Sequence, residues 1–397
     1  MKRHLLIFTW EYYGYHSKQG TALSKRPRQV AESFIINGWD VTVIHKDQLN
    51  ESKENAYSIS VENGVRRISI KQTNNSDYNK NVILRKLETL YYLAFHGDRT
   101  YNWATDVINN FSHFCIDKPS VIISFFTPRV PLYLGSYFSR KLNVPWIADL
   151  QDPIYEGVSK EASLLCRLWM KHILRSAKSV IHISPEWAKI DAHLINRDIY
   201  TIRHAVPENK MEQSPGKDNY LDNNAFYIFY GGSITPSIQS ISLLKQTISS
   251  VASSSINIQI LIAGDPSVYD YFKTEIGEKY VKHLGWLTYD VMVSYIQKSN
   301  CTLVIPWSEE RIGIPSKFYE LCNYKKPIWI IGDDLGAFTT LLDEWRHPKI
   351  KINDLAYQKE ALTSAMNNDY QYMFNVSSCK GEYITSSSLY KEYKKVI

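Results

Sequence analysis

The chain has 397 residues, of which 44% are hydrophobic, so it is long enough for two domains and can bury two cores. Lys and Arg outnumber Asp and Glu by 27 to 19 in residues 1–205, whereas the remainder has 19 against 21. This imbalance predicts anionic partners for the first half only: membrane headgroups, a lipid-linked pyrophosphate or nucleic acid. Five cysteines without a CxxC pair argue against a disulfide framework or a zinc site and predict free thiols.

The N-terminal segment begins with a short apolar run, and residues 4–10 are predicted to form a buried strand. This run is too short for a signal peptide, and no later run reaches the roughly 20 residues of a membrane span. We therefore expect a cytoplasmic protein, either free in the cytoplasm or at the inner face of the cell membrane. A helix at 25–37 and a strand at 39–44 follow, as at the start of doubly wound α/β domains. The absence of GxGxxG after the first strand argues against a dinucleotide dehydrogenase.

Basic residues gather where the first helix is expected to begin. Gly20 and Thr21 precede Lys25, Arg26 and Arg28. Backbone N–H groups and cations here could bind an acceptor phosphate. A solvated basic helix start explains the same residues equally well.

The next elements end in a pair of aspartates. Asp149 is the last residue of a predicted strand at 144–149, and Asp152 follows three residues later. Two carboxylates at the exit of a strand suggest a functional site. Alternatively, Asp152 caps the following turn. The elements expected before this strand are a hairpin at 57–61 and 65–70, helices at 82–95, 101–114 and 132–142, and a strand at 121–126.

Residues 163–176 are predicted to form an amphipathic helix. Leu164, Leu168 and Trp169 are on its apolar side, with Lys171 and Arg175 on its charged side. A core-packed helix is the usual explanation, and a helix lying on a membrane surface is the alternative. A strand at 180–183, a helix starting at 184–186, a strand at 200–207 and a hinge loop at 210–224 follow.

The second half repeats the strand–turn–helix pattern. A strand at 226–230, Gly231-Gly232-Ser233 and a helix at 238–251 describe a turn that can cradle a phosphate. The expected later elements are strands at 258–263, 281–284, 301–305 and 328–331, a short helix from Pro315 carrying Glu320, and helices at 289–298, 355–366 and 389–396.

This order of elements resembles the GT-B glycosyltransferases, specifically the retaining enzymes of family 4 type. The resemblance covers nearly the whole chain. It implies an α/β fold of two Rossmann-like, doubly wound domains facing each other across a cleft: residues 1–207 bind the acceptor, 208–383 bind the donor, and a helix at 384–397 crosses back to the first domain. The segments that carry it are Gly38–Ile44, Asp149–Pro153, Tyr230–Gly232, Leu261–Gly264, His283–Trp286, Gly313–Glu320 and Lys326-Pro327.

The resemblance also implies roles for individual residues. Glu320 corresponds to the second glutamate of the family's pair, which binds the donor ribose, while the first corresponds to Ile312. Lys317 in the first place, and Lys245 in the second, replace the cations that usually neutralise the diphosphate. Asp152 positions the acceptor hydroxyl or the sugar. Acceptor contacts are expected from Gly20, Thr21, Lys25, Arg26 and Asp149. Donor contacts are expected from Gly231, Gly232, Ser233, Gly264, Gly285, Trp286, Leu287, Ile314, Pro315, Ser316 and Glu320.

The implied reaction moves a sugar with retention from a nucleotide sugar, with UDP as the expected nucleotide, to a glycan or polyprenyl-pyrophosphate-linked acceptor in surface polysaccharide synthesis. No metal or other cofactor is expected, because no DxD motif follows a strand and positive charge can stabilise the leaving group. Two alternatives stay open: a nucleotide-sugar 2-epimerase on the same fold, and a non-catalytic nucleotide-sugar-binding protein. Nucleic-acid binding is not expected, because the basic residues are not interleaved with aromatic ones.

Overall fold

The computed structural model describes residues 2–12, 22–47, 56–72, 82–155, 158, 162–208, 221, 225–232, 236–251, 257–306 and 313–397. The chain divides into two compact units. The first contains the described residues up to Ala205 together with Ile384–Ile397, and the second contains those from Val206 to Tyr383. Apart from Leu221, the hinge loop expected at 210–224 lies outside the described residues.

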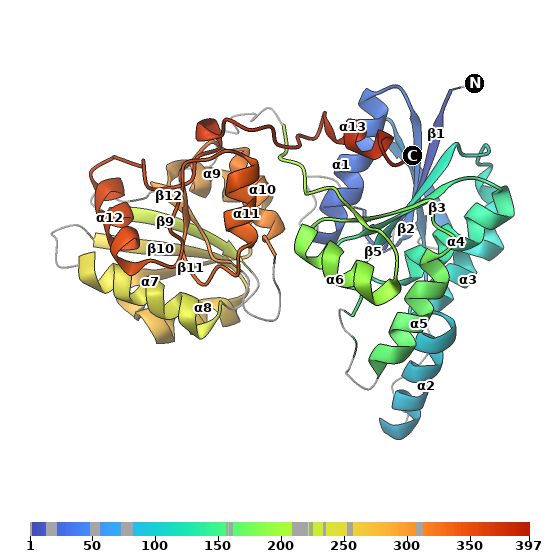
Figure 1. The fold of residues 1–397 in the computed structure, drawn as a ribbon, viewed down its shortest axis with the longest axis horizontal. Helices are drawn as coiled ribbons and strands as arrows, with labels where there is room; N and C mark the ends of the chain where they lie inside the picture. Colours follow the sequence, from blue (N-terminus) through green and yellow to red (C-terminus); the bar gives the residue numbers. More distant parts are fainter. Residues whose placement is uncertain are drawn as a thin grey trace. The chain divides into compact units, whose positions relative to one another are not determined.

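An eight-stranded sheet forms the centre of the first unit, in the order β3-β4-β2-β1-β5-β6-β7-β8 (Figure 1). All neighbouring strands are parallel except β3 and β4, which form an antiparallel hairpin. The strands are β1 (His4–Phe8), β2 (Asp40–Lys46), β3 (Tyr57–Glu62), β4 (Val65–Ile70), β5 (Val121–Phe126), β6 (Trp146–Leu150), β7 (Ser179–His182) and β8 (Tyr200–Thr201).

Helices cover both faces of this sheet. Alternate residues of the buried strands enter two different cores: Leu5 and Ile7 pack with α1 and α13, whereas Leu6 and Phe8 pack with α3, α4 and α5. This alternation is why the parallel strands read as continuous apolar runs. The helices are α1 (Ala22–Ile36), α2 (Val82–Phe95), α3 (Tyr101–Asn110), α4 (Val130–Leu142), α5 (Ser163–Leu174), α6 (Pro185–Ile195) and α13 (Leu389–Lys394).

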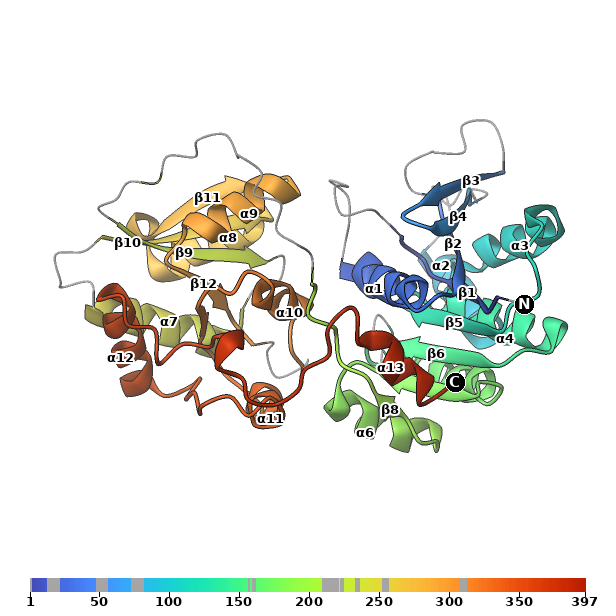
Figure 2. The same cartoon turned by 90° about the horizontal axis from the view of Figure 1, so that it is seen from above.

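The C-terminal helix α13 belongs to the first unit and lies beside α1 (Figure 1, Figure 2). Tyr390 and Tyr393 pack edge-to-face on Phe34 of α1. Trp39 Nε1 donates to Tyr390 Oη at 3.1 Å, and Ser179 Oγ donates to the Val396 carbonyl at 2.7 Å. These contacts attach the last residues of the chain to its first helix and to β7.

The second unit has a five-stranded parallel sheet in the order β11-β10-β9-β12-β13, with a buried core on each face. The strands are β9 (Ala225–Gly232), β10 (Asn257–Gly264), β11 (Val281–Gly285), β12 (Cys301–Val304) and β13 (Ile328–Ile330). The helices are α7 (Ile238–Val251), α8 (Pro266–Ile276), α9 (Tyr289–Lys298), α10 (Ser316–Cys322), α11 (Ala337–Glu344) and α12 (Leu355–Met366).

Two local predictions are wrong, and two helices, α8 and α11, are not predicted by the sequence. The strand predicted at 200–207 is paired only at Tyr200–Thr201. Gly231 and Gly232 do not form a turn, because both pair with β10 as the last residues of β9.

Candidate functional site

Glycines line the carboxyl edge of the second unit's sheet at β9 and β10. Gly231 pairs with Ala263, and Gly232 pairs with Gly264. Gly264 has φ +120, and a Cβ there would lie 3.0 Å from the Gly232 carbonyl oxygen. The two strand ends therefore approach so closely that a side chain at Gly264 would be strained. Bare backbone at the carboxyl edge of a parallel sheet is where α/β domains bind ligands.

The ammonium group of Lys317 lies at this glycine edge. A Cβ built on Gly231 would lie 3.0 Å from Lys317 Nζ, so the lysine occupies the space that a side chain would take. Lys317 Nζ also lies 3.5 Å from Met292 Sδ of α9, and its side chain is half-buried. Lys245, the other lysine that the sequence suggested for the phosphate, is exposed in the middle of α7.

Glu320 lies on the same side of α10 as Lys317. The two are three residues apart and half-buried, whereas Phe318, Tyr319 and Leu321 are buried. Burial raises the pKa of Tyr324, and the nearby Glu320 carboxylate raises it further. The Tyr324 hydroxyl donates to Tyr289 Oη at 3.3 Å. Because α10 has only seven residues, positive charge on this edge comes from Lys317 rather than from a long helix dipole.

The segment after β11 presents an aromatic side chain to solvent. Gly285 has φ +68, and Trp286 is 74% exposed. Leu287 instead packs against the core of the second unit. An exposed indole on a glycine turn can stack on a planar ring.

The remaining residues singled out in the sequence divide into two groups. Ile314 is buried, and Pro315 and Ser316 are half-buried at the start of α10. Ser233, Ile312, Gly20 and Thr21 lie outside the described residues, and so their predicted roles stay predictions.

Arg26 and Asp149 form a structural ion pair in the first unit. Arg26 Nε and Nη2 donate to the two Asp149 carboxylate oxygens at 2.8 and 3.0 Å, and both side chains are 0% exposed. Tyr393 Oη donates to the same carboxylate, and Arg26 Nη1 donates to the Arg203 carbonyl at 3.1 Å. Burial lowers the pKa of Arg26, but Asp149 and Tyr393 outweigh it and leave that pKa raised.

The predicted acceptor contacts of Arg26 and Asp149 are therefore wrong, because neither side chain offers a polar atom to a ligand. Lys25 is half-buried in the first turn of α1. Of the predicted acceptor residues that the structure describes, it alone is not enclosed by the core.

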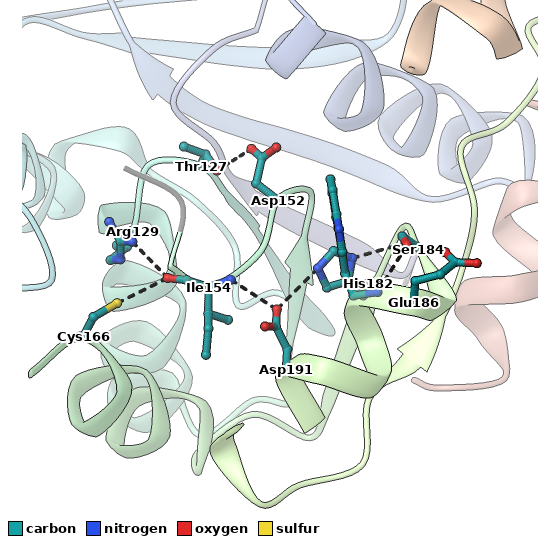
Figure 3. A network of polar contacts seen from close by, with 10 residues as sticks. Thr127, Arg129, Asp152, Ile154, Cys166, His182, Ser184, Glu186 and Asp191 are labelled. Atoms are coloured by element: carbon teal, nitrogen blue, oxygen red, sulfur yellow. Dashed lines mark hydrogen bonds and ion pairs between the residues drawn. The ribbon is translucent and has the colours of Figure 1, made fainter. Parts of the chain in front are cut away.

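Asp152 lies on a loop whose backbone is held at Ile154, through both the N–H and the carbonyl of that residue. Asp152 accepts a 2.7 Å hydrogen bond from Thr127 Oγ1 and is half-buried (Figure 3). Two residues later, the Ile154 N–H donates to Asp191 Oδ2 at 3.2 Å. The Ile154 carbonyl accepts from Arg129 Nη2 at 2.9 Å and from Cys166 Sγ at 3.2 Å. The loop that presents Asp152 is therefore fixed by three buried side chains, from the N-cap residue of α4, from α5 and from α6.

His182 at the end of β7 completes this network. Its Nε2 lies 3.5 Å from Asp191 Oδ2, and its Nδ1 accepts from the Ser184 N–H at 3.3 Å (Figure 3). The sequence analysis missed Asp191 as a support of the loop. One signal was available, because Asp191 shares the buried stripe of α6 with Trp187, Ala188 and Ile195. An aspartate on an apolar stripe needs a buried partner.

Among the described residues, no group of three or more His, Cys, Asp or Glu side chains is arranged to hold a metal ion. At the glycine edge, the charged group that the structure places beside Gly231 is the Lys317 ammonium.

No protein-family model and no curated protein matches this sequence. Several solved structures do align with the structure of this chain. A glycosyltransferase from Rickettsia africae aligns with TM-score 0.58 and 12% identity over 100% of this chain and 98% of that chain. Anabaena HepE in complex with UDP and glucose aligns with TM-score 0.55 and 11% identity over 100% of both chains. A UDP-forming trehalose-phosphate synthase from Burkholderia xenovorans aligns with TM-score 0.56 and 10% identity over 100% and 95%.

The fold is GT-B, with two Rossmann-like domains. This confirms the predicted fold class.

Proposed function

We propose that the protein is a glycosyltransferase that moves a sugar from a nucleotide-sugar donor, UDP-linked in our proposal, to a glycan or lipid-linked acceptor with retention of configuration. The pathway that we propose is the synthesis of a bacterial-type surface polysaccharide or glycoconjugate. The observation that carries the proposal is Lys317 Nζ beside Gly231, at the carboxyl edge of a GT-B donor-type sheet. Similar structures whose descriptions include UDP and glucose support the choice of donor.

The chemistry follows from the charges at this edge. Departure of a nucleoside diphosphate leaves negative charge on its phosphate oxygens, which the Lys317 ammonium can stabilise without a metal ion. The absence of a side chain at Gly231 leaves room for the Lys317 ammonium beside the place that we propose for the diphosphate. Glu320 can accept hydrogen bonds from two ribose hydroxyls, because a carboxylate has two acceptor oxygens. Trp286 can stack on the base. Asp152 positions the reacting hydroxyl from its fixed loop.

Replacing Lys317 or Glu320 with alanine is expected to lower kcat/KM for the nucleotide sugar at least tenfold, or about 1.4 kcal/mol of transition-state stabilisation. Lys245→Ala removes an exposed lysine of the same unit and should leave the rate unchanged. Thermal shifts with UDP-, GDP-, ADP- and CMP-sugars would first identify the donor, since a ligand of the folded state stabilises it by mass action. Wild-type turnover in both site variants would overturn the assignment.

The two alternative functions give different results in the same assays. A 2-epimerase consumes the nucleotide sugar with no acceptor present. A binding protein shows the thermal shift, and loses it in Glu320→Ala, but turns over no donor across an acceptor panel. Either result would replace the proposed transfer reaction while keeping the donor site.

Gly231→Ala is expected to weaken donor binding about tenfold with little change in melting temperature. The new methyl group would lie 3.0 Å from Lys317 Nζ and 3.2 Å from a Phe229 ring carbon. The lysine is flexible and can move away, but its ammonium then leaves the phosphate position. Isothermal titration with the identified nucleotide sugar measures the effect. An unchanged Kd would show that the phosphates bind elsewhere.

A further inference from the structure

Five large apolar side chains are exposed on two helices of the first unit. Leu87, Tyr91 and Phe95 of α2 are 58%, 55% and 66% exposed, and Leu164 and Leu168 of α5 are 62% and 56% exposed. The two helices pack side by side (Figure 1). Soluble monomers rarely leave apolar side chains clustered in water unless the surface binds something.

Core packing does not explain these side chains. Their spacing of four residues gives each helix one exposed apolar stripe. The core of the first unit already takes the other side of α5, through Trp169, Met170 and Ile173. The sequence pattern groups Leu164 and Leu168 with Trp169 on one apolar side, but only Trp169 is buried. Helix α5 thus has two apolar sides, of which only one is covered.

The charge beside the exposed leucines has one sign. Between Ser163 and Arg175 there is no acidic residue, and Lys171, His172 and Arg175 are exposed at the C-terminal end of α5. Lysine is depleted from the centres of protein–protein interfaces. Leucine, aromatic and basic residues together on a surface helix are instead typical of helices that lie on anionic lipid.

We propose that α2 and α5 dock the first unit on an anionic lipid bilayer. The five apolar side chains enter the headgroup layer, and Lys171 and Arg175 contact lipid phosphates. Among the described residues no helix is long and apolar enough to span a bilayer, so the attachment that we propose is peripheral. Docking does not depend on the proposed glycosyl transfer. Only its purpose, access to a lipid-linked acceptor, rests on that function.

Vesicle sedimentation with the full chain tests this without any sugar substrate. We expect binding to phosphatidylcholine vesicles that contain phosphatidylglycerol, weaker binding as salt rises, and little binding to phosphatidylcholine alone. Phe95→Ser/Leu168→Ser and, separately, Lys171→Glu should each weaken binding about tenfold. The matched controls are Ile238→Ser, which removes a 76% exposed side chain of α7, and Lys245→Glu, and both should bind as wild type.

The controls also give the results that would overturn the proposal. It fails if wild type ignores anionic vesicles, or if the controls lose as much binding as the α2 and α5 variants. It also fails if light scattering shows a wild-type dimer that Phe95→Ser/Leu168→Ser dissociates, because the surface then joins two copies of the chain. Circular dichroism checks that each variant is folded, which the exposure of the replaced side chains favours. If vesicle binding holds but no sugar is transferred, docking stands and the proposed function falls.

Discussion

Asp149→Ala is expected to lower the free energy of unfolding of the first unit by about 3–5 kcal/mol, because it leaves the buried Arg26 charge without its partner. Arg26 and Asp149 are both fully enclosed, so water cannot replace the lost carboxylate. The Tyr393 hydroxyl loses its acceptor as well, and α13 loses a contact with the core. Denaturant unfolding followed by fluorescence measures the change.

The Lys2–Asp40 pair provides the matched control. Lys2 Nζ and Asp40 Oδ1 are 2.5 Å apart, yet the two side chains are 62% and 56% exposed. Asp40→Ala should therefore cost only about 0–1 kcal/mol. The double variant Arg26→Met/Asp149→Leu should recover most of the loss of Asp149→Ala, because it removes both charges together. A loss below about 1 kcal/mol in Asp149→Ala would mean that the pair is open to water.

The acceptor contact predicted for Asp149 is wrong because the residues next to it in the sequence do not reveal its partner. A carboxylate near a strand exit fits a ligand site and a buried ion pair equally well. The difference depends on Arg26, which is 123 residues away and meets Asp149 only when α1 packs on the sheet. Asp152, three residues on, has no such partner from the core and keeps its half-exposed position. The same motif thus contained one structural residue and one candidate site residue.

The predicted helices and strands agree closely with the observed ones where a single hydrophobic periodicity dominates the segment. The helices at 82–95, 238–251, 289–298 and 355–366 and the strand at 121–126 have the predicted bounds. Helix α8 was missed although Asp265 caps it and Pro266 opens it, because its tyrosines, valine and phenylalanine favour strands. Its buried residues Val268, Phe272 and Ile276 are four apart, a helical spacing that outweighs propensity.

The candidate donor site was partly predictable. Lys317 and Glu320 were identified from their position after a strand and a loop. Their relation to Gly231 was not, since it requires the parallel pairing of β9 and β12 across the sheet. For Leu164 and Leu168, the sequence predicted that they share an apolar stripe, but it did not predict that this stripe is exposed. A helical pattern shows which residues share a stripe, but only the packed structure shows which stripe stays uncovered.

Acidification from pH 6.5 to 5 is expected to lower the stability of the first unit by about 3 kcal/mol, through two buried histidines. Burial, with the nearby charge of Arg67, lowers the pKa of His45 to about 3. Burial and the charges of Arg26 and Lys25 lower the pKa of His204 well below 6.5. Both are neutral in the folded chain, whereas the unfolded chain takes up protons below pH 6.5. The stability that each neutral, buried histidine contributes is thus fully present well above pH 6.5. Below pH 6.5 this contribution falls, with a slope that approaches about 1.4 kcal/mol per pH unit for each histidine.

His45→Gln separates this effect from general acid sensitivity. The variant lacks one of the two groups, so its stability between pH 6.5 and 5 should fall about half as steeply as that of wild type, whatever its stability at neutral pH. Denaturant unfolding of wild type and of the variant at a series of pH values gives both slopes. Equal slopes for His45→Gln and wild type would mean that His45 is protonated in the folded chain, and its burial on β2 beside Arg67 argues against that.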